Sequence, residues 1–248
     1  MNKNKVACIV SLLLIQPILG QTIWSGGNNR IPGMSGGGEI GLSSTSNDLY
    51  DTLMLSFLAG TSNTNMKPSF LELEGGGAIG VTNIDDPEID PFLNLDLSGG
   101  AILKYEFNLG GDHHLVPFLR TGLTVNYLDN TQQTTVGYSP LYLYGGDIYQ
   151  DRYYTETGTS FFDLYGRVSA GLSYISPNEK FAFSAEFGYW NDLAGDLTGL
   201  TEDVSPVSWR TQMFFGVAEN LGLKLFYESI EIGDFNTSSF GTSFCFMF

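Results

Sequence analysis

The chain has 248 residues, of which 42% are hydrophobic, 15% charged and 14% aromatic, and it carries a formal net charge of -16. This hydrophobic and aromatic content excludes a disordered chain. With 11 basic against 27 acidic residues, the composition argues against nucleic-acid binding, which needs a basic surface to neutralise phosphates. The two cysteines, Cys8 and Cys245, exclude a disulfide scaffold and a cysteine-rich zinc site.

The first 20 residues have the order of a secretory signal peptide. Lys3 and Lys5 precede a mostly apolar run over 6–15, and the small residue Gly20 precedes a polar Gln21. The run is shorter than the roughly 20 apolar residues that a membrane-spanning helix needs. We therefore expect residues 1–20 to direct export and then to be removed.

The rest of the chain alternates apolar and polar residues with a period of two, which places successive side chains on opposite faces of a β-strand. In 181–189, for example, Phe183, Phe187 and Tyr189 share one face, and Ser184 and Glu186 share the other. The alternation predicts ten strands, over 38–45, 52–61, 70–83, 97–109, 119–127, 162–174, 181–189, 207–217, 221–231 and 238–248.

The connections between these strands are short on one side and long on the other. The short turns fall at 63–67, 110–114, 176–179 and 218–220, and the long acidic connections include 85–94, 130–160 and 191–206. Outer-membrane barrels have short periplasmic turns, long extracellular loops and an even number of strands. The alternative is a soluble sandwich or lipocalin-like barrel, in which the Phe-rich face would form the core.

Charge placement favours the membrane barrel, because acidic and basic residues share the polar face of the strands and could pair inside a lumen. The predicted lumen charge network is Glu39, Glu72, Glu74, Lys104, Glu106, Arg120, Asp163, Arg167, Lys180, Glu186, Arg210, Lys224 and Glu228. We therefore predict an all-β fold, a closed antiparallel transmembrane barrel of about ten strands, with eight or twelve as alternatives. Its divisions are a signal peptide over 1–20, an N-terminal periplasmic segment over 21–37 and the barrel over 38–248.

The C-terminus carries the most specific signal, because aromatic residues alternate to the last position at Phe240, Phe244, Phe246 and Phe248. This pattern resembles the terminal strand of bacterial outer-membrane barrel proteins, and 117–122 and 169–177 are similar to the small opacity-type barrels. The resemblance implies a location in the outer membrane, reached through the periplasm. It also implies that Phe244, Phe246 and Phe248 act as an assembly signal, so the expected partners are outer-membrane lipid and the assembly machinery.

Three motifs that could carry chemistry have simpler interpretations. The glycine runs at 75–80 and 36–41 fit a dinucleotide fingerprint in spacing, but residues 81–87 read as strand and turn, where pyrophosphate binding needs a helix. His113 and His114 are the chain's two histidines and lie in a predicted periplasmic turn. The acidic run at 85–90 lacks calcium-loop spacing and is expected to be a solvated loop. We predict no catalytic residue, cofactor or metal ligand.

Three functions are consistent with the sequence. The most favoured is a structural envelope protein or narrow pore with a charged, largely filled lumen. The least favoured is an outer-membrane hydrolase. The alternative between them is a surface adhesin that binds an extracellular ligand through a tyrosine-rich loop over 138–154. Its candidate contacts are Tyr138, Tyr142, Tyr144, Tyr149, Tyr153 and Tyr154. Tyrosine offers rigid contact area in recognition surfaces.

Overall fold

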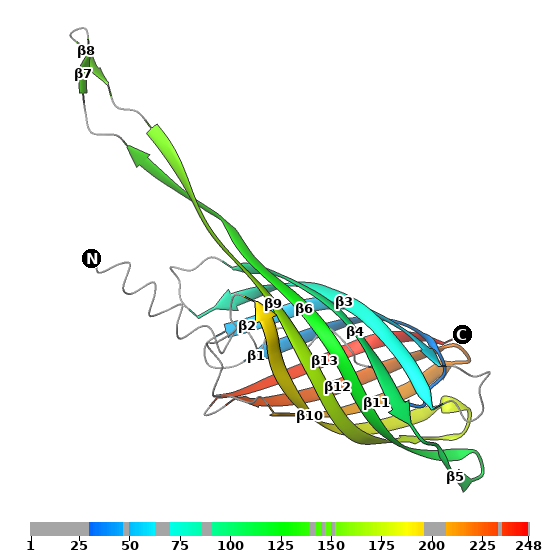
Figure 1. The fold of residues 1–248 in the computed structure, drawn as a ribbon. Coiled ribbons are helices and arrows are strands. Elements are labelled where there is room, and N and C mark those ends of the chain that lie inside the picture. Colours follow the sequence, from blue (N-terminus) through cyan, green and yellow to red (C-terminus); the bar gives the residue numbers. More distant parts are fainter. Residues whose placement is uncertain are drawn as a thin grey trace.

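The structure, a computed structural model, describes residues 30–46, 50–62, 70–85, 91–138, 142–144, 147–149, 152–195, 207–232 and 235–247. Within these residues the chain is almost entirely β-strand (Figure 1). The one helical element described is the short 3-10 turn η1 (Pro177–Glu179). No helix among the described residues is long and apolar enough to cross a membrane.

The strands follow the chain in up-and-down order. They are β1 (Gly37–Ser46), β2 (Tyr50–Ser62), β3 (Leu71–Ile84), β4 (Phe92–Lys104), β5 (Phe107–Gly110), β6 (His113–Tyr138), β7 (Tyr142–Tyr144), β8 (Asp147–Tyr149), β9 (Arg152–Ile175), β10 (Phe181–Gly195), β11 (Val207–Ala218), β12 (Leu221–Ile232) and β13 (Phe235–Met247).

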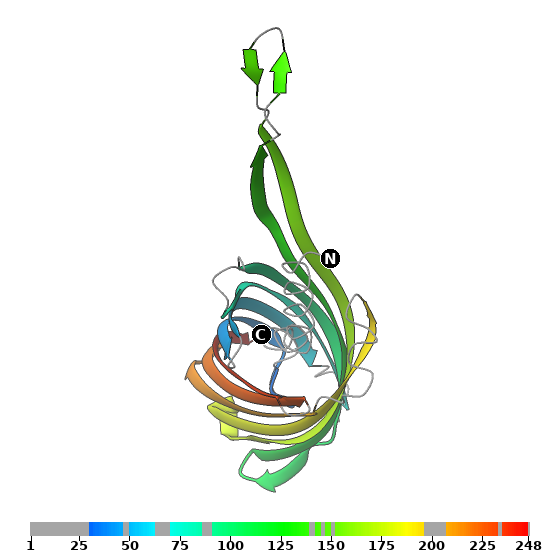
Figure 2. The same ribbon diagram turned by 90° about the vertical axis from the view of Figure 1, so that its left-hand side faces the viewer.

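The sheet closes on itself, as the ring of strands in Figure 2 shows. β1 pairs antiparallel with β13 from Gly37↔Met247 to Ser46↔Ser238, and β4 pairs antiparallel with β6. The short β5 pairs only with the first residues of β6, so ten strands form the ring. Closure pairs the backbone N–H and C=O groups at the two edges of the sheet. A sheet in the hydrocarbon of a membrane requires this, because no water is there to bond these groups. The predicted fold class, a closed antiparallel barrel of about ten strands, is confirmed.

The two mouths of the barrel differ. We call the end where β1 begins and β13 ends the terminal mouth, and the opposite end the ribbon mouth. At the ribbon mouth, β6 and β9 continue beyond their barrel partners and pair with each other as far as Tyr138↔Arg152. This β6–β9 ribbon projects well away from the barrel in both views (Figures 1 and 2).

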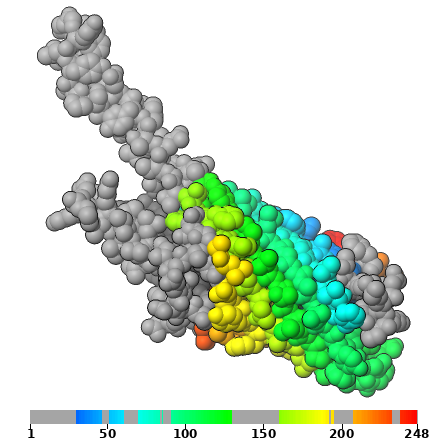
Figure 3. Space-filling view, in the orientation of Figure 1, coloured from blue at the N-terminus to red at the C-terminus, as the bar shows by residue number. Residues whose placement is uncertain are grey.

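The two faces of the barrel wall have opposite chemistry. On β4, Leu97 is 62% exposed on the outside, whereas its neighbour Asp96 is 1% exposed on the inside. Outward residues on the other strands are also large and apolar, among them Phe57, Leu123, Phe187 and Phe244. The strands run as tilted bands across the outer surface (Figure 3). An apolar exterior around a polar interior is the reverse of a soluble core, so the apolar side chains face lipid.

One expectation about the connections is wrong. The sequence predicted 130–160 as a long loop, yet the described parts of this segment pair as the β6–β9 ribbon. The residues of the ribbon are polar at successive positions, as in Asn130–Thr135, and so they lack the apolar alternation by which the barrel strands were recognised. An alternating pattern is expected where one face of a strand is buried against a core or lipid, and the sequence of the ribbon does not show that pattern.

Candidate functional site

The candidate site is the barrel lumen. It is occupied by charged side chains from most of the ring strands and by that of Arg30. Among the predicted network residues, the side chains buried inside are Glu72, Glu74, Lys104, Arg120, Asp163, Arg167, Glu186, Arg210, Lys224 and Glu228. Glu39 is half-buried, and Glu106 is exposed at the terminal mouth. Lys180 differs from the prediction, because it is exposed beside η1 and precedes the first residue of β10.

The centre of the lumen holds a series of alternating charges. Arg120 on β6 lies 3.2 Å from Glu74 on β3 and 2.7 Å from Glu186 on β10. Arg167 on β9 pairs with the same Glu186, and its guanidinium lies 3.8 Å from Glu228 on β12. Each buried charge thus faces an opposite one, which offsets the cost of removing it from water.

Arg210 on β11 completes this central network. Its guanidinium lies 2.6 Å from Glu228 and 3.6 Å from Glu186. Arg167 also stacks on the ring of Trp190, with its guanidinium carbon 4.6 Å from the ring centroid. The indole N–H of Trp190 donates to Ser208 at 3.0 Å, which fixes the ring under the arginine. We call Glu74, Arg120, Arg167, Glu186, Arg210 and Glu228 the central network.

Two further sets of ion pairs lie toward the terminal mouth. Lys104 at the end of β4 lies 2.6 Å from both Glu72 and Glu106. Lys224 on β12 pairs with Glu39 on β1. Because Lys224 and Glu39 are far apart in sequence, their pair helps to hold the wall together from inside.

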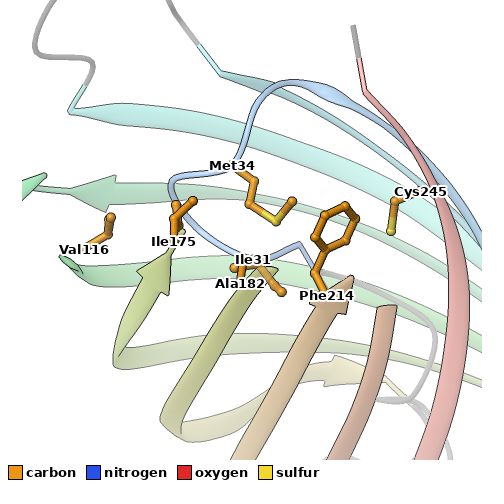
Figure 4. Close-up of a cluster of buried hydrophobic side chains, with 7 residues drawn as sticks. All are labelled: Ile31, Met34, Val116, Ile175, Ala182, Phe214 and Cys245. Carbon is orange, nitrogen blue, oxygen red and sulfur yellow. The ribbon is translucent and has the colours of Figure 1, made fainter. Parts of the chain in front are cut away.

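An element that the sequence prediction missed is an internal plug made of residues 30–36. Ile31 and Met34 are buried against inward side chains of the wall, in a cluster that Figure 4 shows with Val116, Ile175 and Phe214 among its members. Gly33 has φ +94°, and an added Cβ would lie 2.8 Å from Ile175 Cδ1 and 2.9 Å from Val116 Cγ2. The turn therefore requires glycine at this position.

Polar contacts fasten the plug to the wall. Ser35 donates from its backbone N–H and its hydroxyl to Glu179 Oε1, at 3.0 and 2.7 Å. The Gly33 N–H donates to Glu72 Oε1 at 3.1 Å, and Arg120 donates to the carbonyl of Arg30. The plug is therefore linked both to η1 and to the central network.

A small cavity lies beside the plug. A cavity of about 30 Å³ lies between the plug and the wall, lined in part by Arg30, Met34, Lys224 and Cys245. A water molecule needs at least about 10–15 Å³ of such space. The cavity therefore has room for one or two waters.

The sequence gives only a weak indication of the plug. Ile31 and Met34 stand in a short stretch with no periodicity, and the sequence assigned 21–37 to a periplasmic segment. The described part of that segment, residues 30–36, contacts the inside of the barrel. The signals that could have revealed it are two isolated apolar residues flanking Pro32 and Gly33 immediately before the first strand.

The predicted assembly signal and loop contacts are described only in part. Phe244 and Phe246 face outward on β13, whereas Phe248 lies outside the described residues. The strands that carry Tyr138, Tyr142, Tyr144, Tyr149, Tyr153 and Tyr154 are described, but the side chains of these tyrosines are not.

The motifs weighed for chemistry lie in ordinary barrel structure. Gly75–Gly80 belongs to β3, and His113 Nδ1 hydrogen-bonds the Tyr174 hydroxyl at 2.7 Å near the terminal mouth. Asp85 is exposed at the end of β3, and 86–90 lie outside the described residues. The described residues bring no three carboxylate, imidazole or thiol side chains together in a metal-binding group.

No family model and no curated protein matches this chain. Solved structures are similar to it at low identity. The translocator domain of the autotransporter NalP from Neisseria meningitidis is 10% identical, with 99% of this chain and 98% of that chain covered and a TM-score of 0.41. An outer membrane channel from Pseudomonas putida F1 is 10% identical, with 88% of this chain and 97% of that chain covered and a TM-score of 0.43.

The transport unit of the autotransporter AIDA-I from Escherichia coli is 11% identical, with 89% of this chain and 93% of that chain covered and a TM-score of 0.38. Values this low carry no conclusion about activity. The assignment comes from the chain's own residues, whose apolar exterior, closed ring and paired interior charges define the fold. The chain is a closed, ten-stranded, antiparallel transmembrane β-barrel.

Proposed function

We propose that this chain is an integral outer-membrane protein with a filled lumen, serving as a structural envelope protein or as a narrow pore. The observation that carries the proposal is the series of ion pairs across the lumen, from Glu74 through Arg120 and Glu186 to Arg210 and Glu228. A wide channel needs a water-filled lumen, whereas these side chains meet one another across it. Barrels only slightly narrower than this one have interiors that side chains fill.

The plug supports the same proposal. Residues 30–36 occupy the terminal mouth, and their contacts with Glu72 and Glu179 hold them there. Passage of a solute would require the plug to move and the central network to rearrange. Any conductance should therefore be small and intermittent.

Single-channel recording in planar bilayers tests this function. The native chain should give long closed periods and small currents. Replacing Ile31 and Met34 together by Ser weakens the apolar hold on the plug and should make openings more frequent. As a control, Val217→Ser changes an outward, 70% exposed side chain and should leave the currents unchanged.

Two outcomes of this recording decide between the alternatives. A large, steady conductance from the native chain would contradict a filled lumen. Silence from both the native chain and the plug variant would favour the structural role over the narrow pore.

A second candidate function is surface recognition through the β6–β9 ribbon. The observation in its favour is that β6 and β9 remain paired, through Gln133↔Thr157 to Tyr138↔Arg152, where the barrel strands no longer flank them. Such a ribbon would present the tyrosine-rich segment 138–154 at a distance from the barrel. Binding of cells to host or envelope ligands that is lost on deleting 139–151 would support this role.

A hydrolytic role has less support. His113 is engaged with Tyr174 near the terminal mouth, which is the end opposite the β6–β9 ribbon. We therefore propose a non-enzymatic protein.

A further inference from the structure

Three neighbouring strands place two carboxylates and an amide in one row inside the barrel. Asp96 on β4 is paired in register with Asn126 on β6, and Asn126 is paired with Asp163 on β9. Their exposed fractions are 1%, 0% and 0%, so all three lie in the interior of the lumen. Ser98, two residues beyond Asp96, lies on the same inner face of β4.

The hydrogen bonds of Asn126 leave oxygen atoms without donors. Its Nδ2 donates to Asn94 Oδ1 at 2.8 Å and to Asp96 Oδ1 at 2.5 Å, which uses both hydrogens of the amide. Among the described residues, Asn126 Oδ1, Asp96 Oδ2 and Ser98 Oγ are buried and have no hydrogen-bond partner. Asn126 Oδ1 is thus a buried oxygen without a donor, and its residue lies between Asp96 and Asp163 in the row.

The charge of Asp96 is not balanced by the ion pairs of the lumen. Among the described residues, Asp96 makes no ion pair, and Arg120, Arg167 and Arg210 are engaged with the carboxylates of the central network. A buried carboxylate without a cation is costly. Asp96 therefore brings an unbalanced negative charge to a row in which buried oxygen atoms lack donors.

We propose that Asp96, Ser98, Asn126 and Asp163 form a site for a hard divalent cation, with Ca²⁺ as the ion of choice. Ca²⁺ binds carboxylate, amide carbonyl and water oxygens, and two carboxylates match its charge. Directly paired residues have Cβ atoms about 4.5–5.5 Å apart, so two steps separate Asp96 from Asp163 by roughly 10 Å. The two side chains cover part of that distance, and two Ca²⁺–oxygen bonds of about 2.4 Å each span the rest.

The site lies apart from the plug and the central network, and it does not depend on whether the barrel conducts. Its ion would link β4 to β6 and β9, and the β6–β9 ribbon extends from the last two of these strands. Binding of Ca²⁺ should therefore stabilise the wall at the base of this ribbon.

Terbium luminescence gives a direct measurement, since Tb³⁺ replaces Ca²⁺ at oxygen sites and is excited through a nearby tyrosine. Tyr165 is buried two residues after Asp163 on the same face of β9. Full-length protein is refolded into detergent with EDTA and exchanged into detergent without EDTA. Addition of Tb³⁺ should then give sensitised emission that Ca²⁺ competes away. Ca²⁺ should also raise its melting temperature, because a ligand that binds only the folded state stabilises it.

Asp96→Asn keeps the shape and the bond from Asn126 but removes a charge, so Tb³⁺ and Ca²⁺ should bind at least about tenfold more weakly. Ser98→Ala is a milder variant and should weaken binding less. Asp85→Asn removes an exposed carboxylate at the end of β3 and should leave binding and melting unchanged. Folding of each variant is checked by its migration in unboiled gels.

The proposal is overturned if the folded native protein shows no sensitised emission and no Ca²⁺-dependent shift in melting. It is equally overturned if folded Asp96→Asn binds as tightly as the native chain. A loss of binding in Asp85→Asn would place the ion at the β3 end instead and would also overturn it.

Discussion

At the residue scale, each arginine of the central network forms ion pairs with two carboxylates. Arg210 lies 2.6 Å from Glu228 and 3.6 Å from Glu186, and all three side chains are buried. Replacing Arg210 by Met preserves much of the volume but leaves the three carboxylates of the central network with only two arginines. Breaking a buried pair in this way typically costs about 3–5 kcal/mol.

We therefore expect Arg210→Met to lower the urea midpoint of unfolding in detergent, and Arg167→Met to do the same. Lys180→Met is the matched control, because Lys180 is exposed beside η1 and should tolerate the change. Midpoints that do not move in either arginine variant would show that water, and not the partner carboxylates, solvates these positions.

Gly33 offers a second residue-scale prediction, on the plug. Gly33→Ala forces a side chain into φ +94° and brings its Cβ within 2.8 Å of Ile175 Cδ1. The strain should displace the plug while the strands keep their pairing, since the ladder begins at Gly37. Faster proteolysis near residue 30, with unchanged barrel migration in gels, is the expected result. Gly111→Ala also has a positive φ but its Cβ would meet nothing closer than 3.6 Å, and so it controls for backbone strain alone.

At the scale of elements, the β6–β9 ribbon is independent of the barrel. Among the described residues, the last barrel pairings of its strands are Leu93↔Asp129 on one side and Gly195↔Asp163 on the other. Shortening the ribbon by joining Gln133 to Thr157 through a two-residue turn should therefore leave the barrel folded. Unboiled migration and melting temperature measure this, and a large drop in either would mean that the ribbon supports the wall.

The ribbon can also be used to test which mouth of the barrel faces the outside of the cell. An epitope tag inserted at Gly146 should be accessible on intact cells, and one inserted at Pro177, in η1, should not. The opposite pattern of accessibility would invert the topology expected from the loop lengths.

The sequence predicted most of the elements because burial of one face leaves a period of two. Each of the ten expected ranges overlaps a ring strand, although the range 97–109 joined the end of β4 to β5. The sequence did not predict the ribbon or the plug, for different reasons. The ribbon extends beyond the barrel wall and its sequence has no alternating pattern, and in the plug two apolar side chains are too few to show one. Lys180 was assigned to the lumen because alternation cannot fix where a strand begins, and the turn ends at Lys180 itself.

At the scale of the whole molecule, closure should make the barrel resistant to detergent. All ring strands are paired on both sides, so no edge is open to unfolding or aggregation. We expect unboiled protein in dodecyl sulfate to migrate faster than boiled protein. Identical migration under both conditions, or a monomer soluble in water without detergent, would contradict the membrane assignment.

A separate question is whether the C-terminal aromatic residues contribute to the barrel only through burial or also as a signal for its assembly in the cell. Phe240, Phe244 and Phe246 face outward on β13, and each is at least 43% exposed to the lipid side. Burial of one such aromatic side chain contributes roughly 1.5–3 kcal/mol, a loss that the other outward residues could absorb. The resemblance to barrel C-termini implies a larger effect for Phe248, because assembly machinery would read the terminal aromatic before the barrel closes.

Deletion of Phe248 and the substitution Phe240→Ala separate these two accounts, since each removes one aromatic side chain from the C-terminal segment of the chain. If burial alone matters, both variants should reach the outer membrane at near-native levels and melt slightly earlier. If the terminal aromatic is a signal, only the Phe248 deletion should accumulate in the periplasm or be degraded, while both variants refold normally in detergent. We predict the second result, because refolding in detergent needs only the pairing of β13 with β1 and β12, which neither change removes. Normal outer-membrane levels of the deletion variant would show that the last residue contributes only its contact with lipid.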